Sequence, residues 1–434
     1  MTTATAGSAE LRRISLSSYA GSAIEFYDFF IYGTAAALVF PTVFFPDLGP
    51  LMATTASLGA FAAAFLARPV GAAVFGHFGD RISRKHTLVV TLLMMGFATV
   101  GVGLIPDTAT IGIAAPLLLL GLRLVQGFAV GGEWAGAVLL SAESSPQERR
   151  GFYGMFTQLG LGTALVLANL VFYLVQMVFG EDPGSAFFGW AWRIPFLLSG
   201  VLILVALYVR VHVTESPTHA EPAEAHTGTP LVELFRRQGR QVLLAGGVAI
   251  CAPMLVFQAG TFFTHYAADR LDFSYDLVLM VGVIGGLCAV GFAVLSAILS
   301  DTVGRRRVVT LGFAVAAPWS FAVFPLIETG EKVVFGVTIV ATYCLIGWCM
   351  GPLAALLPEI FAPQYRYTGA ALSHTFGAIV GGAVPPVVSP LLLADVGGWA
   401  VSVMMGALAL VSLVCVRALP ETSGRDLVVR FDGV

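Results

Sequence analysis

The chain has 434 residues, of which 57% are hydrophobic and 11% are charged, and its mean hydropathy is +0.86. A soluble domain carries about a quarter charged residues, so these proportions exclude a soluble globular protein and predict one embedded in a lipid bilayer. The formal net charge of −3 gives no sign of a basic surface, and we expect no nucleic-acid binding.

Twelve apolar runs follow one another along the chain, and each is long enough to cross a bilayer, which takes about 20 mostly apolar residues. They predict an all-α membrane protein with twelve transmembrane helices. The runs cover residues 17–40, 51–75, 87–104, 113–141, 154–178, 194–211, 242–266, 277–299, 308–326, 333–355, 369–393 and 399–419.

The first run contains two acids, Glu25 and Asp28, on one helix face, with Tyr32 one turn further along. The fourth run contains a third acid, Glu133. Charges inside a membrane are expensive and usually functional. An acid in a low-dielectric site has a raised pKa and can load and release a proton, so these three are candidates for proton coupling.

Three arginines lie in the same half of the chain: Arg68 in the second run, Arg123 in the fourth and Arg193 at the start of the sixth. An arginine can clamp a carboxylate through two parallel hydrogen bonds. A purely structural network of ion pairs is the alternative interpretation. Arg193 follows Trp192, and it fits an interface anchor as well as a substrate ligand.

A charged loop, Gly76–Lys85, separates the second and third runs, and residues 297–306 repeat part of its pattern between the eighth and ninth. Both stretches read Asp, three residues, Arg and a further basic residue, with an apolar helix on each side. A repeated hairpin predicts a duplicated bundle, here two pseudo-symmetric six-helix bundles.

The longest polar break, 212–240, is too short to fold by itself and contains Pro217, Pro222 and Pro230. We therefore expect an N-terminal bundle at 1–211, a cytoplasmic linker at 212–240, a C-terminal bundle at 241–419 and a cytoplasmic tail at 420–434. Residues 231–237 are expected to form a short amphipathic helix on the membrane surface.

Basic residues alternate between the two sides of the predicted bundle. With both termini in the cytoplasm, 18 of the 23 basic residues fall in cytoplasmic segments, and only Arg270 and Lys332 fall in outside loops. This distribution follows the positive-inside rule. It predicts a multi-pass membrane protein with both ends in the cytoplasm.

Cofactor chemistry has little support in the sequence. All five cysteines lie inside apolar runs and lack metal-ligand spacing, so we expect packing roles. No glycine-rich phosphate loop is present. We expect no metal, no cofactor other than the proton as coupling ion, and no enzymatic activity.

The charged loop resembles the signature loop that follows the second helix in the major facilitator superfamily, with Ser83 in place of the usual glycine. Further stretches resemble its metabolite:proton symporter family, and two of them, 34–40 and 365–370, look most like shikimate transporters. The others are 21–33, Arg68-Pro69-Val70-Gly71, 123–127, 131–134, Trp192-Arg193-Ile194-Pro195-Phe196 and Glu215-Ser216-Pro217. Phe26 stands where many members of the family have tryptophan.

The resemblance implies two bundles around a central site that opens alternately to either side. It makes Arg68 and Arg193 candidates for anion recognition, and we expect substrate contacts from these two with Arg123, Tyr32 and Gln126. It also implies a cytoplasmic charge latch that holds the inner side shut and that includes Arg123. The expected gate residues are Asp80, Arg81, Arg84, Glu143, Asp301, Arg305 and Arg306.

The expected function is import of a small organic carboxylate, either shikimate-like or a dicarboxylate, by proton symport, in a protein that works as a monomer. Proton-coupled import of a zwitterion such as proline or betaine is the first alternative. A non-transporting nutrient sensor on the same scaffold is a distant one, because the linker and tails are short. Drug export fits less well with arginines buried in the first half.

Overall fold

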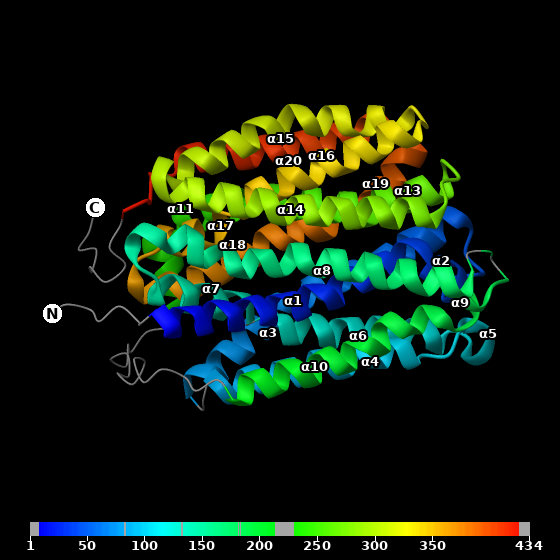
Figure 1. Ribbon diagram of the computed structural model, residues 1–434, viewed down its shortest axis with the longest axis horizontal. Helices are drawn as coiled ribbons and strands as arrows, with labels where there is room; N and C mark the ends of the chain where they lie inside the picture. Colours follow the sequence, from blue (N-terminus) through cyan, green and yellow to red (C-terminus); the bar gives the residue numbers. More distant parts are fainter. Residues whose placement is uncertain are drawn as a thin grey trace.

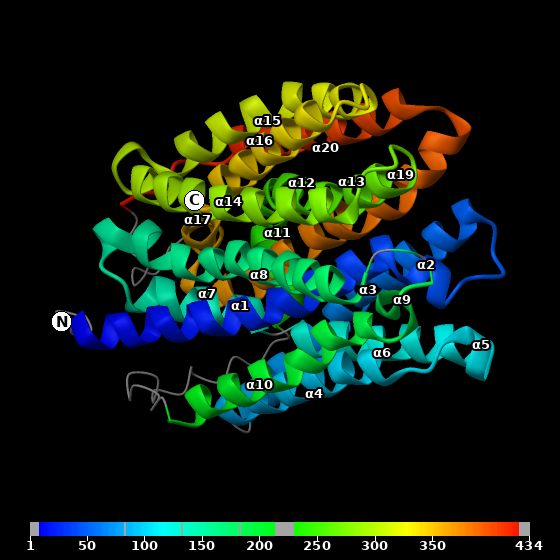
Figure 2. The same cartoon turned by 45° about the vertical axis from the view of Figure 1, so that its right-hand side comes forward.

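The computed structural model describes residues 8–81, 84–131, 133–180, 182, 184–212 and 230–424. Long helices run side by side along the longest axis of the molecule (Figure 1). Helix α1 (Ser8–Leu38) begins, and α20 (Gly398–Ala418) ends, at the same end, which we call the termini end. The opposite, far end holds the short helices α2 (Phe40–Val43), α5 (Thr108–Ile111) and α9 (Ala186–Gly189) (Figures 1 and 2).

The first half of the chain supplies six helical segments. Besides α1, they are α3 (Pro50–Arg81), α4 (Arg84–Leu104), α6 (Ala114–Val130) followed by α7 (Glu133–Ser144), α8 (Arg150–Phe179) and α10 (Ile194–His212). The turns η1 (Gln147–Arg149) and η2 (Ala191–Arg193) lead into α8 and α10.

The second half supplies the other six, and three of these are composite. The seventh consists of α11 (Pro230–Val248), α12 (Cys251–Phe257), η4 (Gln258–Phe262) and α13 (Phe263–Asp269). The rest are α14 (Tyr275–Val303), α15 (Arg305–Glu328), α16 (Lys332–Met350) with α17 (Leu353–Ile360), then η5 (Pro363–Tyr365) with α18 (Arg366–Gly377), η6 (Ala378–Ala383) and α19 (Val384–Asp395), and finally α20.

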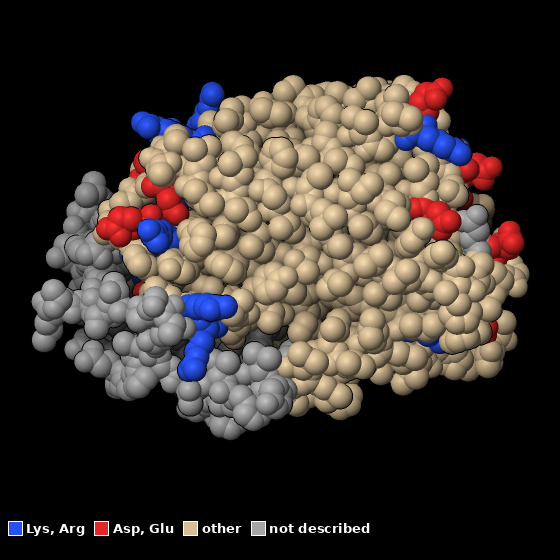
Figure 3. All heavy atoms as spheres, in the orientation of Figure 1, with Lys and Arg blue, Asp and Glu red and all other residues tan. Residues whose placement is uncertain are grey.

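Length and apolar composition identify most of these segments as membrane spans. In the described part of the chain, eight segments are long and apolar enough to cross a bilayer, and α4, α6 and α10 contain three shorter apolar stretches. The remaining segment, α1, is 31 residues long, but Glu25 and Asp28 in its interior lower its hydropathy. Figure 3 shows charged side chains gathered at the two ends of the molecule, with an uncharged belt between them. The twelve-helix architecture expected from the sequence is confirmed.

Several predicted runs are divided between two helices in the structure. The run 113–141 is divided between α6, which ends at Val130, and α7, which begins at Glu133. The helix packs closely against α3 here, since a Cβ atom on Gly131 would lie only 2.1 Å from the backbone oxygen of Arg68. The corresponding helix of the second half breaks between Met350 and Leu353.

The two π-helical turns, η4 and η6, both lie in the second half. A π turn accommodates one extra residue and locally shifts the helix register, and such turns are frequent at functional sites. After η6, the tandem prolines Pro385 and Pro386 occupy the first turn of α19, where they need no backbone N–H donor.

The predicted linker is only partly within the described residues. Helix α11 begins at Pro230 and bends at Gln238, which has φ −128° and ψ 25°. The helix expected at 231–237 is therefore the first part of α11. Residues 213–229 lie outside the described part, and the domain boundaries stay a prediction.

Candidate functional site

Asp28 of α1 is fully buried, and its carboxylate is held by hydroxyl groups from two other helices. Thr99 Oγ1 on α4 donates to Oδ2 at 2.8 Å, and Ser199 Oγ on α10 donates to Oδ1 at 2.6 Å. Each carboxylate oxygen thus accepts a hydrogen bond from the protein, which offsets part of the cost of burying this polar group. These contacts fix the position of Asp28 between three helices.

A chain of polar groups connects Asp28 to Arg123. Gln126 Nε2 donates to Thr99 Oγ1 at 2.8 Å, and Arg123 Nη1 donates to Gln126 Oε1. Arg123 Nε also donates to the Phe61 carbonyl oxygen at 3.3 Å. The acid on α1 and the arginine on α6 are therefore connected by hydrogen bonds through two neutral side chains, although they lie far apart in the sequence.

Four aromatic rings surround Arg68 and Arg123, and we call Phe29, Tyr32, Phe61 and Phe65 the aromatic cage. The guanidinium carbon of Arg123 lies 4.1 Å from the Tyr32 ring centroid, 4.5 Å from Phe29 and 5.0 Å from Phe61. That of Arg68 lies 4.4 Å from Phe29 and 4.5 Å from Phe65. Cation–π attraction stabilises each guanidinium, but it leaves two positive charges against the single ring of Phe29.

Three polar atoms at the cage have no hydrogen-bond partner among the described residues: Tyr32 Oη, Arg68 Nε and Arg123 Nη2. All three are buried. A buried donor without an acceptor is destabilising by about 1–3 kcal/mol, and such groups are rare in folded proteins. The site therefore presents positive charge and open donors, which is the chemistry that binds a carboxylate.

The two other predicted acids are Glu25 on α1 and Glu133 on α7. Glu25 is 2% exposed and interacts electrostatically with Arg68, so its charge lies beside the cage. Glu133 is the first residue of α7, but its side chain lies outside the part of the chain whose side chains are described.

Arg193 lies apart from this group, near the far end. Its Nη2 donates to the Ile105 carbonyl at 3.0 Å and its Nη1 to the Gly189 carbonyl at 3.1 Å, and the guanidinium lies 4.4 Å from the Trp192 ring centroid. These contacts tie η2 to the end of α4, as an interface anchor does. Of the three predicted arginines, Arg68 and Arg123 share the aromatic cage, and Arg193 does not contact it in the described contacts.

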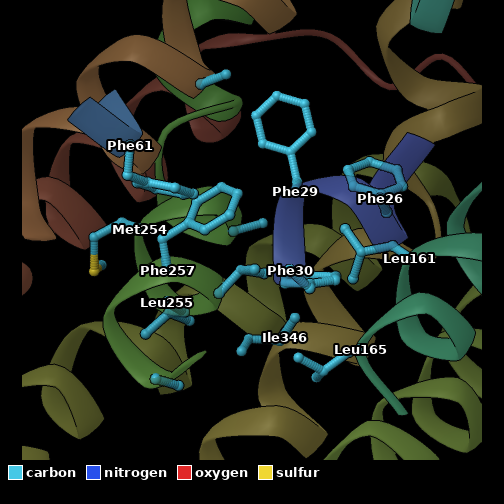
Figure 4. Packing of buried hydrophobic residues seen from close by; sticks show 14 of the residues in the cluster. Phe26, Phe29, Phe30, Phe61, Leu161, Leu165, Met254, Leu255, Phe257 and Ile346 are labelled. Carbon is cyan, nitrogen blue, oxygen red and sulfur yellow. The ribbon is translucent and has the colours of Figure 1, made fainter. Parts of the chain in front are cut away.

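The second half of the chain closes the cage with Phe257, at the end of α12. Its ring centroid lies 5.2 Å from that of Phe61 and 5.3 Å from that of Phe65. Figure 4 shows Phe61, Phe257, Phe29 and Phe30 around this region of the core. Phe257 was missed in the sequence because one of 32 phenylalanines gives no signal. Thr99 and Ser199 were also missed, although polar residues within apolar runs are a weak signal.

At the termini end, Asp301 connects the two halves. It lies near the end of α14, and its Oδ1 and Oδ2 accept hydrogen bonds from the backbone N–H groups of Gly151 and Phe152, both at 2.9 Å. These N–H groups belong to the first turn of α8, where a negative charge is favourable. Arg305 Nη1 contacts Oδ1 of the same carboxylate at 2.5 Å.

Glu359 of α17 extends this contact into what we call the termini-end cluster: Asp301, Arg305, Glu359 and Arg150. Glu359 lies 3.6 Å from Arg305 Nε and 3.9 Å from Arg150 Nη1, and Thr422 Oγ1 donates to it at 2.7 Å. The Glu359 side chain is 1% exposed, so these charges interact strongly.

A second ion pair joins the halves nearby, between Glu143 of α7 and Arg366 of α18 at 3.7 Å. Arg150, Glu359 and Arg366 were not named as gate residues. The missed signal is a second internal repeat, since Glu143 precedes Arg150 by seven residues, as Glu359 precedes Arg366.

Other predicted gate residues do not join the termini-end cluster or lie outside the described side chains. Within the described part of the chain, the hydrogen bonds of Arg306 stay in its own half: its Nη2 donates to the Arg417 carbonyl at 2.7 Å and its backbone N to Glu421 at 3.2 Å. Asp80, Arg81 and Arg84 are at the ends of α3 and α4, and their side chains are not among those described.

Comparison with known proteins identifies the family. A family model described as Major Facilitator Superfamily matches residues 19–385. The chain is 39% identical to the Inner membrane metabolite transport protein YhjE of Escherichia coli (strain K12) over 425 residues, which cover 96% of this chain and 95% of that protein. It is 36% identical to the Shikimate transporter of the same organism over 396 residues, 89% of each.

A Proline/betaine transporter of Salmonella typhimurium is 30% identical over 435 residues, covering 96% of this chain and 85% of that protein. Among solved structures, a D-xylose-proton symporter superposes with a TM-score of 0.77 at 19% identity, covering 95% of this chain and 99% of the other, which establishes the shared fold. The chain belongs to the major facilitator superfamily, and it is a multi-pass membrane transporter rather than an enzyme.

Proposed function

We propose that this transporter imports a small organic carboxylate together with protons. The observation that carries the proposal is the set of open donors on Tyr32, Arg68 and Arg123 inside the aromatic cage. A carboxylate would satisfy these donors and neutralise the two guanidinium charges. The Shikimate transporter among its relatives supports a hydroxylated monocarboxylate, and a dicarboxylate fits the two arginines equally well.

Proton coupling would follow from competition for Arg68. Glu25 interacts electrostatically with Arg68, and an incoming carboxylate would compete with it for that guanidinium. Without this positive neighbour, a carboxylate in a buried site gains a proton more readily. Asp28 is joined to Arg123 through Thr99 and Gln126. Binding of the substrate carboxylate to Arg123 would therefore change the electrostatic environment of Asp28 as well.

The charge carried per cycle depends on the substrate. A monoanion with one proton is electrically neutral, so only the pH gradient would drive its uptake. A zwitterion with one proton carries a positive charge, to which the membrane potential adds about 2.3 kcal/mol per 100 mV. The dependence of uptake on voltage therefore separates the two classes of substrate.

The proposal is tested by a thermal-stability screen of the purified protein. Shikimate, protocatechuate, 2-oxoglutarate and citrate are the carboxylates to compare with proline and betaine. A carboxylate at 100 times its dissociation constant is expected to stabilise the protein by about 2.7 kcal/mol, because it binds only the folded state. If no carboxylate raises the melting temperature of a protein that does unfold cooperatively, the substrate class is wrong.

Import of a zwitterion is the second candidate, and it is favoured by one specific feature. The Phe30 ring centroid lies 6.2 Å from that of Phe257 beside the cage, and aromatic rings attract an ammonium group. The Proline/betaine transporter relatives support this candidate. Stabilisation by proline or betaine alone, with voltage-driven uptake, would favour it over the carboxylate.

The termini-end cluster is proposed to be the cytoplasmic gate, which must separate when the site opens inward. Asp301→Asn should weaken it, because an amide retains one acceptor oxygen and loses the charge that caps α8. The loss of one charge-assisted hydrogen bond is worth about 1.5–3 kcal/mol. We expect hydrogen exchange of the peptide spanning residues 150–155 to accelerate at least about tenfold. Asp276→Asn, at the exposed start of α14, is the matched control, and unchanged exchange in Asp301→Asn would remove Asp301 from the gate.

The topology remains a proposal in the same way. We propose the domain boundaries given above, an inner-membrane location with both termini in the cytoplasm, and a monomer as the working unit. The inner-membrane relative supports the location. Protease access to a tag at either end, compared in intact cells and inverted vesicles, measures the orientation.

A further inference from the structure

We propose that His265 of α13 is a latch that closes the far end of the transporter. It belongs to the second half of the chain, and both of its ring nitrogens contact the first half. Nδ1 lies 2.8 Å from the Ala37 carbonyl oxygen on α1, and Nε2 lies 3.1 Å from Thr54 Oγ1 on α3. One side chain thus joins three membrane helices across the interface that must separate when this end opens.

The partners determine the protonation of the ring. A carbonyl oxygen only accepts, so Nδ1 must carry a hydrogen and donate it to Ala37. In the neutral imidazole, Nε2 then accepts a hydrogen bond from the Thr54 hydroxyl. Both Ala37 and Thr54 are buried, at 2% and 5% exposure, so water does not readily replace either bond. The latch is therefore specific to a side chain with one donor and one acceptor at opposite positions.

The latch continues a close contact between α1 and the seventh segment. One turn before Ala37, a Cβ atom on Gly33 would lie 3.1 Å from Thr261 Oγ1, and Thr261 is one turn before His265. The two segments thus meet at successive turns, and of these two contacts that of His265 lies closer to the far end, where α2 follows α1 (Figures 1 and 2).

Helix α3 connects the latch to the aromatic cage. Thr54, Phe61, Phe65 and Arg68 recur at spacings close to whole helical turns, so they lie along one face. Thr54 is 14 residues before Arg68, which corresponds to about 21 Å along the helix. A movement of α3 that releases Thr54 from His265 therefore also moves two cage rings and Arg68. His265 is a positioning residue for the transport cycle, and its proposed role does not depend on which substrate occupies the cage.

Cysteine accessibility tests the latch without any substrate. Thr261→Cys places a thiol just behind the latch, at a buried position, and a membrane-impermeant maleimide is applied to right-side-out and inverted vesicles. We expect slow labelling of this reporter. Adding His265→Ala should raise the rate about fivefold or more from the far-end side only, because loss of even one net hydrogen bond shifts an equilibrium by about that factor.

Three further variants make the result decisive. Thr54→Val removes one of the two hydrogen bonds of His265 and should raise the labelling rate less than His265→Ala does. Thr54→Ser retains the hydroxyl and should leave the labelling rate unchanged. Thr264→Val is the matched control, because the Thr264 hydroxyl bonds to the Ala259 carbonyl within the same segment at 3.3 Å. Each variant without the reporter measures labelling of the native cysteines.

The latch is wrong if Thr54→Val and His265→Ala both label at the parent rate. If His265→Ala does not fold, the comparison of Thr54→Val with Thr54→Ser still decides, since neither changes the histidine. A rise in labelling with Thr264→Val as large as with His265→Ala would also overturn the proposal, because it would indicate general loosening of α13.

Discussion

Asp28→Asn is expected to abolish proton-driven accumulation while leaving substrate exchange measurable. Asparagine has the shape of aspartate and can still accept one of the two hydrogen bonds from Thr99 and Ser199, so the site should keep its geometry. It has no carboxylate that could take up a proton, and it removes the charge linked to Arg123 through Gln126. In energised vesicles the internal substrate concentration should therefore reach the external concentration and no more.

Counterflow exchange in the same vesicles separates coupling from binding, because it requires movement of the loaded carrier but no net proton transfer. Asp276→Asn makes the same chemical change at the exposed start of α14 and should accumulate substrate normally. Normal accumulation by Asp28→Asn would remove Asp28 from the proton pathway and leave Glu25 and Glu133 as the candidates.

Arg68→Gln is expected to weaken binding of a carboxylate substrate on the order of 100-fold. Truncating one member of a buried, hydrogen-bonded charge pair typically changes the binding free energy by about 2–5 kcal/mol. Among the described residues, Arg68 Nε has no hydrogen-bond partner, so this donor is open to a substrate carboxylate. The same substitution also removes the cation–π contacts with Phe29 and Phe65, so the melting temperature of each variant is measured beside its affinity. The affinity of Arg68→Lys should fall between those of the unchanged protein and Arg68→Gln, because lysine keeps the positive charge but lacks the planar guanidinium with its two parallel donors. Isothermal titration of the purified protein measures all three affinities.

Arg193→Gln is the matched control for this experiment. The Arg193 guanidinium already donates to two backbone carbonyls, so we expect its loss to lower stability and to change substrate affinity less than about threefold. If Arg193→Gln weakens binding as much as Arg68→Gln does, the substrate site extends to the far end and the cage alone does not define it.

The sequence predicted the helices and drew attention to four charged residues of the candidate site for the same physical reason. Apolar runs are long and regular, and a charge within one is conspicuous, so Glu25, Asp28, Arg68 and Arg123 could be identified without coordinates. The hydroxyl groups that hold Asp28 were not predicted, because serine and threonine are common in membrane helices and cost little there. Phe257 was not predicted, because the sequence around an aromatic residue in an apolar run looks the same whether its ring faces lipid or the interior of the protein.

Placement of the arginines depended on information that the sequence does not contain. Arg193 and Arg68 look alike as isolated charges, and only the positions of the Ile105 and Gly189 carbonyls distinguish an anchor from an open donor. Arg123 was assigned to a gate by resemblance as well as to the substrate site, and the structure places its guanidinium against the rings of Tyr32, Phe29 and Phe61. The pairing of Arg150 with Glu359 joins residues more than 200 positions apart, which no local pattern reveals.

The contact between Asp301 and α8 has a consequence for how this protein can vary. The donors are backbone N–H groups of Gly151 and Phe152, and almost any amino acid supplies such a group. Position 152 can therefore change its side chain freely without weakening the joint, with the single exception of proline, which has no N–H. Position 151 is restricted for a steric reason instead, since a Cβ atom there would lie 2.6 Å from the Ala297 carbonyl oxygen. Sequence drift at this joint is thus limited by shape at one residue and by backbone chemistry at the next.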